Sequence, residues 1–188
     1  MNLNRIVTLG LALALSATVA FAADKTAVKS GPQVGEELAG PFHPLNVNGS
    51  KAGEKSCLYC SNGSNPVAMV FARESTPELK ALVKKLDAAC AKNAGCKMGS
   101  YVVFCSDETG IEAAAKKLAK DADLKKVVLS IDNPAGPKGY KVSKDADVTV
   151  VLYVNHTVKA NFSFKKGEMK EKDVDAVIKA LPTITEAK

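Results

Sequence analysis

The chain has 188 residues, a formal net charge of +6 and hydrophobic residues at 46% of its positions, which is enough for one domain with a core of its own. The positive charge comes almost entirely from lysine, because only Arg5 and Arg73 of the 26 basic residues are arginines. Sequence-specific recognition of nucleic acid depends on the forked guanidinium group, so this composition argues against a nucleic-acid partner. The lysines lie at spacings typical of solvated helix faces.

Residues 1–22 have the layout of a secretory signal peptide. Arg5 precedes an apolar run, and Ala20-Phe21-Ala22 then supplies the small residues of a cleavage site before Ala23. The apolar run is shorter than the ~20 residues that a membrane span needs, and no later stretch is long and apolar enough to cross a bilayer. We therefore expect an exported protein, periplasmic or extracellular, with no integral membrane segment after cleavage.

Residues 23–40 are polar and include three glycines, which predicts a flexible lead-in to a domain that spans residues 41–186. Inside the domain, a short strand is expected at Leu45–Val47, followed by a turn at Asn48-Gly49. No later stretch resembles a linker between two domains.

The first strong strand signal is Pro66–Ala72, a continuous apolar run typical of a strand that is buried on both faces. An amphipathic helix is expected over residues 75–92, with Ser75 and Glu78 as its capping box. The remaining elements are expected to be a strand at 101–105, a helix after a second capping box (Thr109 and Glu112), a strand at 127–131, a loop at 133–140, a hairpin of strands at 148–154 and 158–164, and a final helix around 174–181.

This order, β-α-β-α-β and then β-β-α, predicts a parallel sheet that is extended by an antiparallel hairpin. Together with the sequence of residues 139–181, it resembles the thioredoxin superfamily. Residues 41–49, PFHPLNVNG, resemble the strand and turn that open redoxin and peroxiredoxin domains. The resemblance covers residues 38–182 and implies an α/β thioredoxin-like fold, in which a central mixed sheet is flanked by helices and preceded by a β extension.

The catalytic motifs of the family are missing from their usual positions. Thioredoxins carry Cys-x-x-Cys after the first core strand, where the following helix lowers the thiol pKa. Residues 73–77, RESTP, occupy that position and contain neither this motif nor the Thr-x-x-Cys of peroxiredoxins. Residues 145–149 match the segment with the cis-proline of the family and contain no proline. The resemblance therefore implies the fold without the standard thioredoxin or peroxidase activity. Arg73 and Glu74 are expected to lie in an ordinary solvated helix cap, and the alternative is a binding role for that helix N-terminus, for instance toward an anion.

Cys57 and Cys60 form a Cys-x-x-Cys pair that precedes the first core strand instead of following it. Three interpretations of the pair remain open. The pair forms a redox-active disulfide that exchanges with thiols, or it forms a structural disulfide that stabilises a loop. In the third interpretation it supplies half of a four-thiolate metal site, with Cys90 and Cys96 as the other ligands.

The other three cysteines are expected to be structural. Cys90 and Cys96 lie six positions apart across a helix end and are expected to pair with each other. Because that helix runs antiparallel to the strand before it, both are expected at the same end of the sheet as Cys57 and Cys60. Cys105 ends a buried strand at the opposite end and is expected to be a small core residue.

The leading hypothesis is a divergent thiol-disulfide oxidoreductase in which Cys57 attacks and Cys60 resolves. Its partners would be thiols and disulfides of proteins or small molecules, and no cofactor is expected. The competing hypotheses are a non-catalytic interaction or scaffold module with structural disulfides, and the metal-binding module. The two histidines, His43 and His156, have no cysteine or carboxylate at metal or triad spacing and are expected to be plain surface residues.

Overall fold

The structure is a computed structural model that describes residues 28–186, so the signal peptide predicted for residues 1–22 lies outside the described residues. The strands are β1 Leu45–Asn46, β2 Val67–Ala72, β3 Gly99–Cys105, β4 Val128–Asp132, β5 Val148–Val154 and β6 Thr157–Phe164. The α-helices are α1 Leu58–Asn62, α2 Pro77–Lys92, α3 Ile111–Asp121, α4 Glu171–Ala180 and α5 Pro182–Thr185. Among the described residues, no helix is long and apolar enough to span a membrane.

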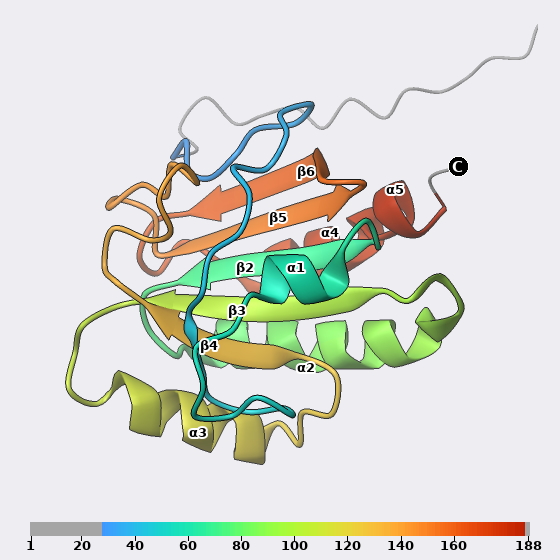
Figure 1. The fold of residues 1–188 in the computed structure, drawn as a ribbon. Helices are drawn as coiled ribbons and strands as arrows, with labels where there is room; N and C mark the ends of the chain where they lie inside the picture. Colours follow the sequence, from blue (N-terminus) through green and yellow to red (C-terminus); the bar gives the residue numbers. More distant parts are fainter. Residues whose placement is uncertain (1–27, 187–188) are drawn as a thin grey trace, which may run out of the picture.

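The six strands form one mixed sheet in the order β1-β4-β3-β2-β5-β6 (Figure 1). Strands β2, β3 and β4 are parallel, whereas β1 and β5 run antiparallel to their neighbours and β6 closes the hairpin with β5. The predicted fold class is confirmed: a parallel β-α-β-α-β half is extended by an antiparallel hairpin and preceded by a short β extension.

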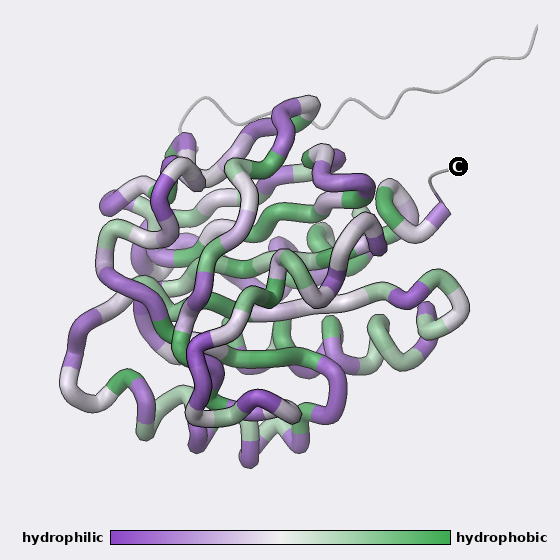
Figure 2. The backbone as a smooth tube through the Cα atoms, in the orientation of Figure 1, coloured by the Kyte–Doolittle hydropathy of each residue, from purple (hydrophilic) through white to green (hydrophobic). Residues whose placement is uncertain are grey.

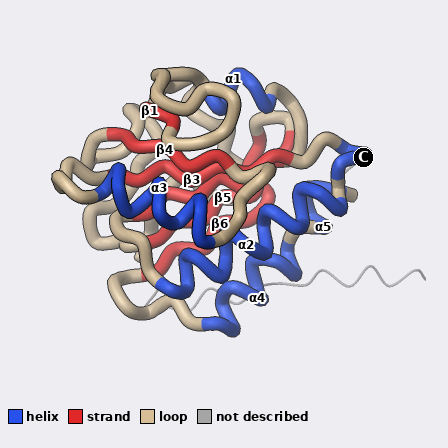
Figure 3. Tube along the Cα trace, turned by 90° about the horizontal axis from the view of Figure 1, so that it is seen from below, coloured by secondary structure: helices blue, strands red, loops and turns tan. Residues whose placement is uncertain are grey.

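The two faces of the sheet are covered differently. Helices α2, α3, α4 and α5 pack on one face, which is why all four lie to the same side of the sheet in Figure 3. On the other face lie Leu38, Phe42, Leu58 of α1, and Tyr140. Alternate residues of β2 pack into each layer, so the whole strand is apolar, and the hydrophobic colour in Figure 2 runs through the central strands.

The helix starts differ from the predicted capping boxes. The N-cap of α2 is Thr76, whose side-chain oxygen accepts a hydrogen bond from the backbone N–H of Leu79, and the cap is not Ser75. With Thr76 as the cap, Pro77 takes the first helical position, where its fixed φ and missing N–H are favourable. Helix α3 begins after Gly110 without a side-chain cap, so the box predicted at Thr109 and Glu112 is also wrong.

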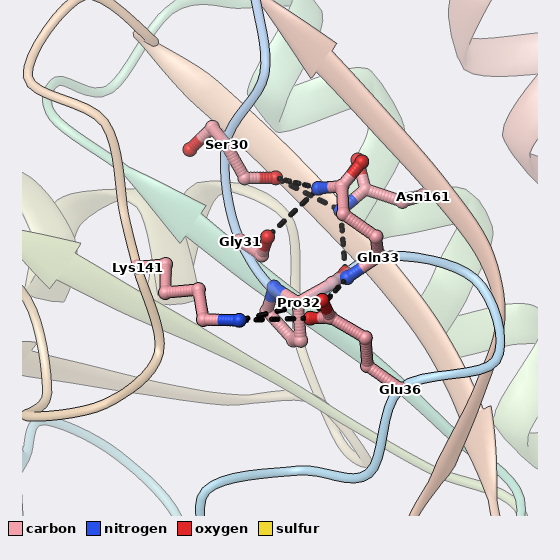
Figure 4. Close-up of polar contacts among 7 residues, drawn as sticks. All are labelled: Ser30, Gly31, Pro32, Gln33, Glu36, Lys141 and Asn161. Carbon is pink, nitrogen blue, oxygen red and sulfur yellow. Dashed lines mark hydrogen bonds and ion pairs between the residues drawn. The ribbon is translucent and has the colours of Figure 1, made fainter.

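The flexible lead-in predicted for residues 23–40 is wrong over residues 28–40, which pack against the sheet. The hydroxyl of Ser30 is buried and bonds the Thr149 hydroxyl at 2.7 Å and the N–H of Ser143 at 3.0 Å. Its carbonyl oxygen accepts a hydrogen bond from the Asn161 amide at 2.9 Å (Figure 4). A polar coil is therefore held by side chains of the sheet, a form of order that its composition does not reveal.

The same segment continues along the edge of β6. The N–H of Gly35 donates to Val158 O at 2.9 Å, and the N–H of Val158 donates to Glu36 O at 3.0 Å. The Glu36 carboxylate also pairs with Lys141 at 3.3 Å (Figure 4). These contacts protect the first part of an otherwise open sheet edge.

Arg73, the residue directly after β2, holds the long loop of residues 133–147 in place. Its Nε donates to Ala146 O at 2.9 Å and its Nη2 to Ser143 O at 2.9 Å. Its Nη1 donates to Pro134 O at 3.0 Å and to Cys105 O at 3.3 Å. One guanidinium thus joins the end of β3 to three points of the loop, which a lysine ammonium has too few directed donors to do.

We predict that Gly31→Ala destabilises the protein more than Gly35→Ala. Both glycines have a left-handed φ, 73° and 85°, so either substitution is expected to cost about 1–2 kcal/mol in backbone strain. A Cβ at Gly31 would also lie 3.0 Å from the Thr149 methyl carbon, whereas a Cβ at Gly35 has nothing within 4 Å. Thermal and urea unfolding should show a further loss of about 1–3 kcal/mol for Gly31→Ala. Equal losses would contradict the packing of this segment.

We predict that Arg73→Lys lowers the free energy of unfolding by about 2–4 kcal/mol, because several charge-assisted hydrogen bonds to backbone carbonyls, three of them part-buried, are lost. Lys166→Ala is the matched control, since Lys166 is an exposed cation beside the same loop and its solvent-screened ion pair with Glu74 should contribute little to stability. Urea unfolding measures both variants. A loss for Arg73→Lys no larger than that for Lys166→Ala would mean that Arg73 does not hold the loop.

Candidate functional site

Cys57 and Cys60 form a disulfide at the start of α1, with their Cα atoms 5.2 Å apart. Cys57 is the N-cap of this helix, and its sulfur accepts a hydrogen bond from the backbone N–H of Cys60 at 3.0 Å. Cys57 is half-buried and Cys60 is exposed. The sequence placed this pair in a loop, but the structure brings the two sulfurs together on a short helix at the molecular surface.

Helix α1 is seated firmly although it has only five residues. Leu58 is buried in the core on this face of the sheet. The side-chain amide of Asn62 donates to Leu58 O at 2.7 Å. A Cβ added at Gly99 would lie only 1.9 Å from the side-chain oxygen of Asn62. A side chain at Gly99 would displace the Asn62 amide, so the glycine lets α1 sit against the amino end of β3.

His156 lies beside the pair, which the sequence analysis missed. Its ring packs against the ring of Tyr59, at a centroid distance of 4.7 Å. Tyr59 is one of the two residues between the cysteines. The neighbouring N–H of Asn155 donates to Ser64 O at 3.1 Å, which ties the β5–β6 turn to the loop after α1. Nδ1 of His156 is buried and has no hydrogen-bond partner within residues 28–186. The prediction of a plain surface histidine is therefore wrong for His156.

The position of His156 could have been inferred from topology. Strand β5 is antiparallel to β2, and Tyr153 pairs with Val67, so the turn after β5 returns to the end of the sheet where β2 starts. The Cys57–Cys60 pair precedes β2 and lies at that same end. His43, in contrast, is exposed, as predicted.

Cys90 and Cys96 are free thiols in the structure, not the predicted disulfide. Cys90 is a core residue of α2, and burial raises the pKa of its thiol to about 12, with Asp87 adding to the shift. Cys90 lies at the predicted end of the sheet, but Cys90 and the Cys57–Cys60 pair lie on opposite faces of the sheet.

The four-thiolate metal site is not formed in the structure. Within the described part of the chain, no three or more His, Cys, Asp or Glu side chains are grouped so that they could hold a metal ion. The sheet separates Cys90 from the disulfide, so the predicted ligands cannot surround one ion.

Cys105 is a buried core residue at the end of β3, as predicted. Burial raises the pKa of its thiol to about 12, which leaves it protonated at neutral pH. Residues 73–77, where the resemblance places the active site of the family, supply Arg73 as a clamp and Thr76 as a helix cap. Of the cysteines in the described chain, only the Cys57–Cys60 pair combines surface exposure with disulfide chemistry.

No protein-family model and no curated protein matches the sequence. Solved structures do match, and one is a candidate thiol:disulfide interchange protein DsbE from Chlorobium tepidum, with a TM-score of 0.59 and 16% identity over 85% of this chain and 99% of that one. Another is a candidate protein disulfide isomerase from Bacteroides thetaiotaomicron, with a TM-score of 0.62 and 13% identity over 85% and 96% of the two chains.

A third match is the peroxidoxin BcpB from Mycobacterium tuberculosis, with a TM-score of 0.57 and 17% identity over 85% of this chain and 98% of that one. At such identities, a structural likeness establishes the fold and leaves the activity to be argued from the site. The resemblance found in the sequence is confirmed at this level, and the chain has a divergent thioredoxin-like fold of the redoxin type.

Proposed function

We propose that this protein is a divergent thiol-disulfide oxidoreductase that uses Cys57 and Cys60 as its exchangeable pair. The observation that carries the proposal is the disulfide at the start of α1, with an exposed sulfur and a backbone N–H directed at the other. Two of the compared structures carry the names of thiol-disulfide proteins, which supports the same chemistry.

The reaction would be two successive exchanges. A thiolate of the partner attacks one sulfur of the Cys57–Cys60 bond, and the electron pair of that bond passes to the other sulfur, which leaves as a thiolate. A second thiolate of the partner then attacks the mixed disulfide, so the partner is oxidised and both cysteines are reduced. The reverse sequence reduces a disulfide of the partner. Neither direction requires a cofactor.

Cys57 is proposed as the attacking thiol and Cys60 as the resolving one. In the reduced protein, the N–H of Cys60 that now donates to the Cys57 sulfur would stabilise a thiolate there, because hydrogen bonds to the charged form lower a pKa. Tyr59, which lies between the two cysteines, packs against His156, so a partner would approach the exposed Cys60.

The second candidate function is a non-catalytic interaction or scaffold module in which the disulfide only stabilises α1. It is favoured by the absence of cysteine from residues 73–77, where Arg73 instead makes structural hydrogen bonds. A bridge that closes so short a loop would contribute only about 2 kcal/mol in the chain-entropy model. The two candidates therefore differ in whether the bond exchanges, and only slightly in what it adds to stability.

We also propose that the protein acts outside the cytoplasm. This rests on the N-terminal sequence, in which Arg5, an apolar run and the Ala20-Phe21-Ala22 site form the layout of a signal peptide. An oxidising compartment would supply the disulfide form of the pair.

We predict that the Cys57–Cys60 bond opens and closes reversibly in glutathione buffers, as measured by alkylation and mass spectrometry of the purified protein. Cys60→Ser should leave Cys57 able to form a stable mixed disulfide with glutathione, since no resolving thiol remains. Cys57→Ser should lower the rate of disulfide reduction to that of buffer alone, because the attacking thiol is absent.

Cys96→Ser is the matched control, because Cys96 is a half-buried free thiol remote from this bond in the sequence and should not affect exchange. A bond that stays closed at every glutathione ratio, in a protein that remains folded, would favour the scaffold module. Full disulfide reductase activity in Cys57→Ser would overturn the assignment of the pair.

A further inference from the structure

A charged pocket lies at the end of the sheet opposite the disulfide. Four chain segments meet there: Glu74 follows β2, Glu108 follows β3, Asp147 precedes β5 and Lys166 follows β6. The cavity has a volume of about 260 Å³, which suits a ligand smaller than a typical drug molecule. Because β2 separates this pocket from the Cys57–Cys60 pair, the following argument does not rest on the proposed exchange activity.

Asp147 is the unusual residue of the pocket, because its acidic side chain is little exposed and has no partner among the described residues. Its residue is only 8% exposed, yet its carboxylate makes no hydrogen bond or ion pair with any other described residue. Its backbone is fixed, since its N–H donates to Phe164 O at 2.8 Å and its carbonyl accepts from the N–H of Arg73 at 3.0 Å. Little of Asp147 is exposed, but its carboxylate oxygens are not fully buried, so the unpaired charge is open to a ligand that enters the cavity.

The cations around the pocket do not neutralise this carboxylate. The guanidinium of Arg73 is occupied by backbone carbonyls, and the ammonium of Lys166 pairs with Glu74 at 2.7 Å. Burial and the nearby charge of Glu74 raise the pKa of Asp147, while Lys166 and Arg73 oppose that shift.

Among the side chains of the pocket that make no hydrogen bond or ion pair with another described residue, the acids outnumber the bases. Glu108 and Asp145 are exposed acids of the pocket without an ion pair in the described chain, and Lys144 is the one uncommitted cation among the described residues that line it. With Asp147, three unpaired carboxylates of the described chain face the ammonium of Lys144 and the charge of Arg73, and the seven lining residues together keep a net charge of −1. The pocket should therefore attract a cation.

The expected cation is organic and not metallic. No group of three or more carboxylates, histidines or cysteines within residues 28–186 is arranged to hold a metal ion. A protonated amine has different needs, because one carboxylate can accept its charge-assisted hydrogen bond while neighbouring acids add long-range attraction. We propose that this pocket binds the primary ammonium group of a small organic molecule, with Asp147 as the acceptor.

The test is a titration of the folded protein followed by ¹⁵N–¹H NMR at the backbone amides of Arg73, Asp147 and Lys166. Putrescine serves as a free amine, glycine as an amino acid, and acetate as a probe that lacks the amine. Saturable shifts with putrescine alone would identify a free amine as the ligand. Shifts with glycine would identify an amino acid whose carboxylate also suits Lys144. Acetate should give no saturable shift.

Asp147→Asn should weaken this binding by about 10-fold or more, because a charge-assisted hydrogen bond is replaced by a neutral one. Asp107→Asn is the matched control: it removes one negative charge from the loop after β3, outside the pocket lining, and should change the affinity much less than Asp147→Asn. Glu108→Gln, at an exposed position, should weaken binding several-fold and provides a second variant if Asp147→Asn does not fold.

Absence of saturable shifts with both putrescine and glycine in the wild-type protein would overturn the proposal. Equal affinities of the wild-type protein and folded Asp147→Asn would also overturn it, since the amine would then bind elsewhere. If Asp147→Asn does not fold, an unchanged affinity in Glu108→Gln has the same consequence. These outcomes are independent of the glutathione experiment, which reports on the other end of the sheet.

Discussion

The hydrogen bonds of Arg73 to four backbone carbonyls are the constraint on which much of this fold depends. They hold the loop of residues 133–147, which has no regular structure of its own, against the carboxyl ends of β2 and β3. The loop in turn supplies Tyr140, whose ring packs on Phe42 at 5.0 Å and Phe71 at 5.8 Å. Part of this face of the sheet is thus covered by an irregular loop that Arg73 anchors, together with the hydrogen bond from Ser143 to Ser30.

This use of Arg73 explains how a thioredoxin-like fold persists without the usual motif at residues 73–77. The position after β2 holds a structural cation where the thioredoxin resemblance places a reactive thiol, and the only disulfide of the described chain lies at the opposite end of the sheet. The two ends of the sheet therefore have different chemistry: sulfur with an aromatic and imidazole neighbour at one, and a cluster of carboxylates at the other.

The sequence predicted those parts of the fold in which burial dictates the residue pattern. Residues 66–72 and 148–154 read as strands because both of their faces are covered, which leaves few positions for a polar side chain; the buried Thr149 is bonded to Ser30. Helix α1 was missed because five residues show no helical period and cysteine is not a usual cap. The packing of Ser30 was missed because hydrogen bonds between a coil and distant strands leave no local pattern. In the candidate site, the Cys-x-x-Cys spacing of Cys57 and Cys60 could be recognised in the sequence. The position of His156 beside them could be predicted only with the pairing of β2 and β5.

The contacts of Ser30 also determine the orientation of the domain on any surface or fusion partner to which its N-terminal side is attached. Ser30 is held by Ser143 and Thr149, at the carboxyl end of β2, and from there the chain follows β6 until the N–H of Leu38 meets His156 O beside the disulfide. A surface, bead or fusion partner attached ahead of residue 28 would therefore connect at the carboxylate-rich end. The disulfide would point away from the attachment and stay accessible to large partners.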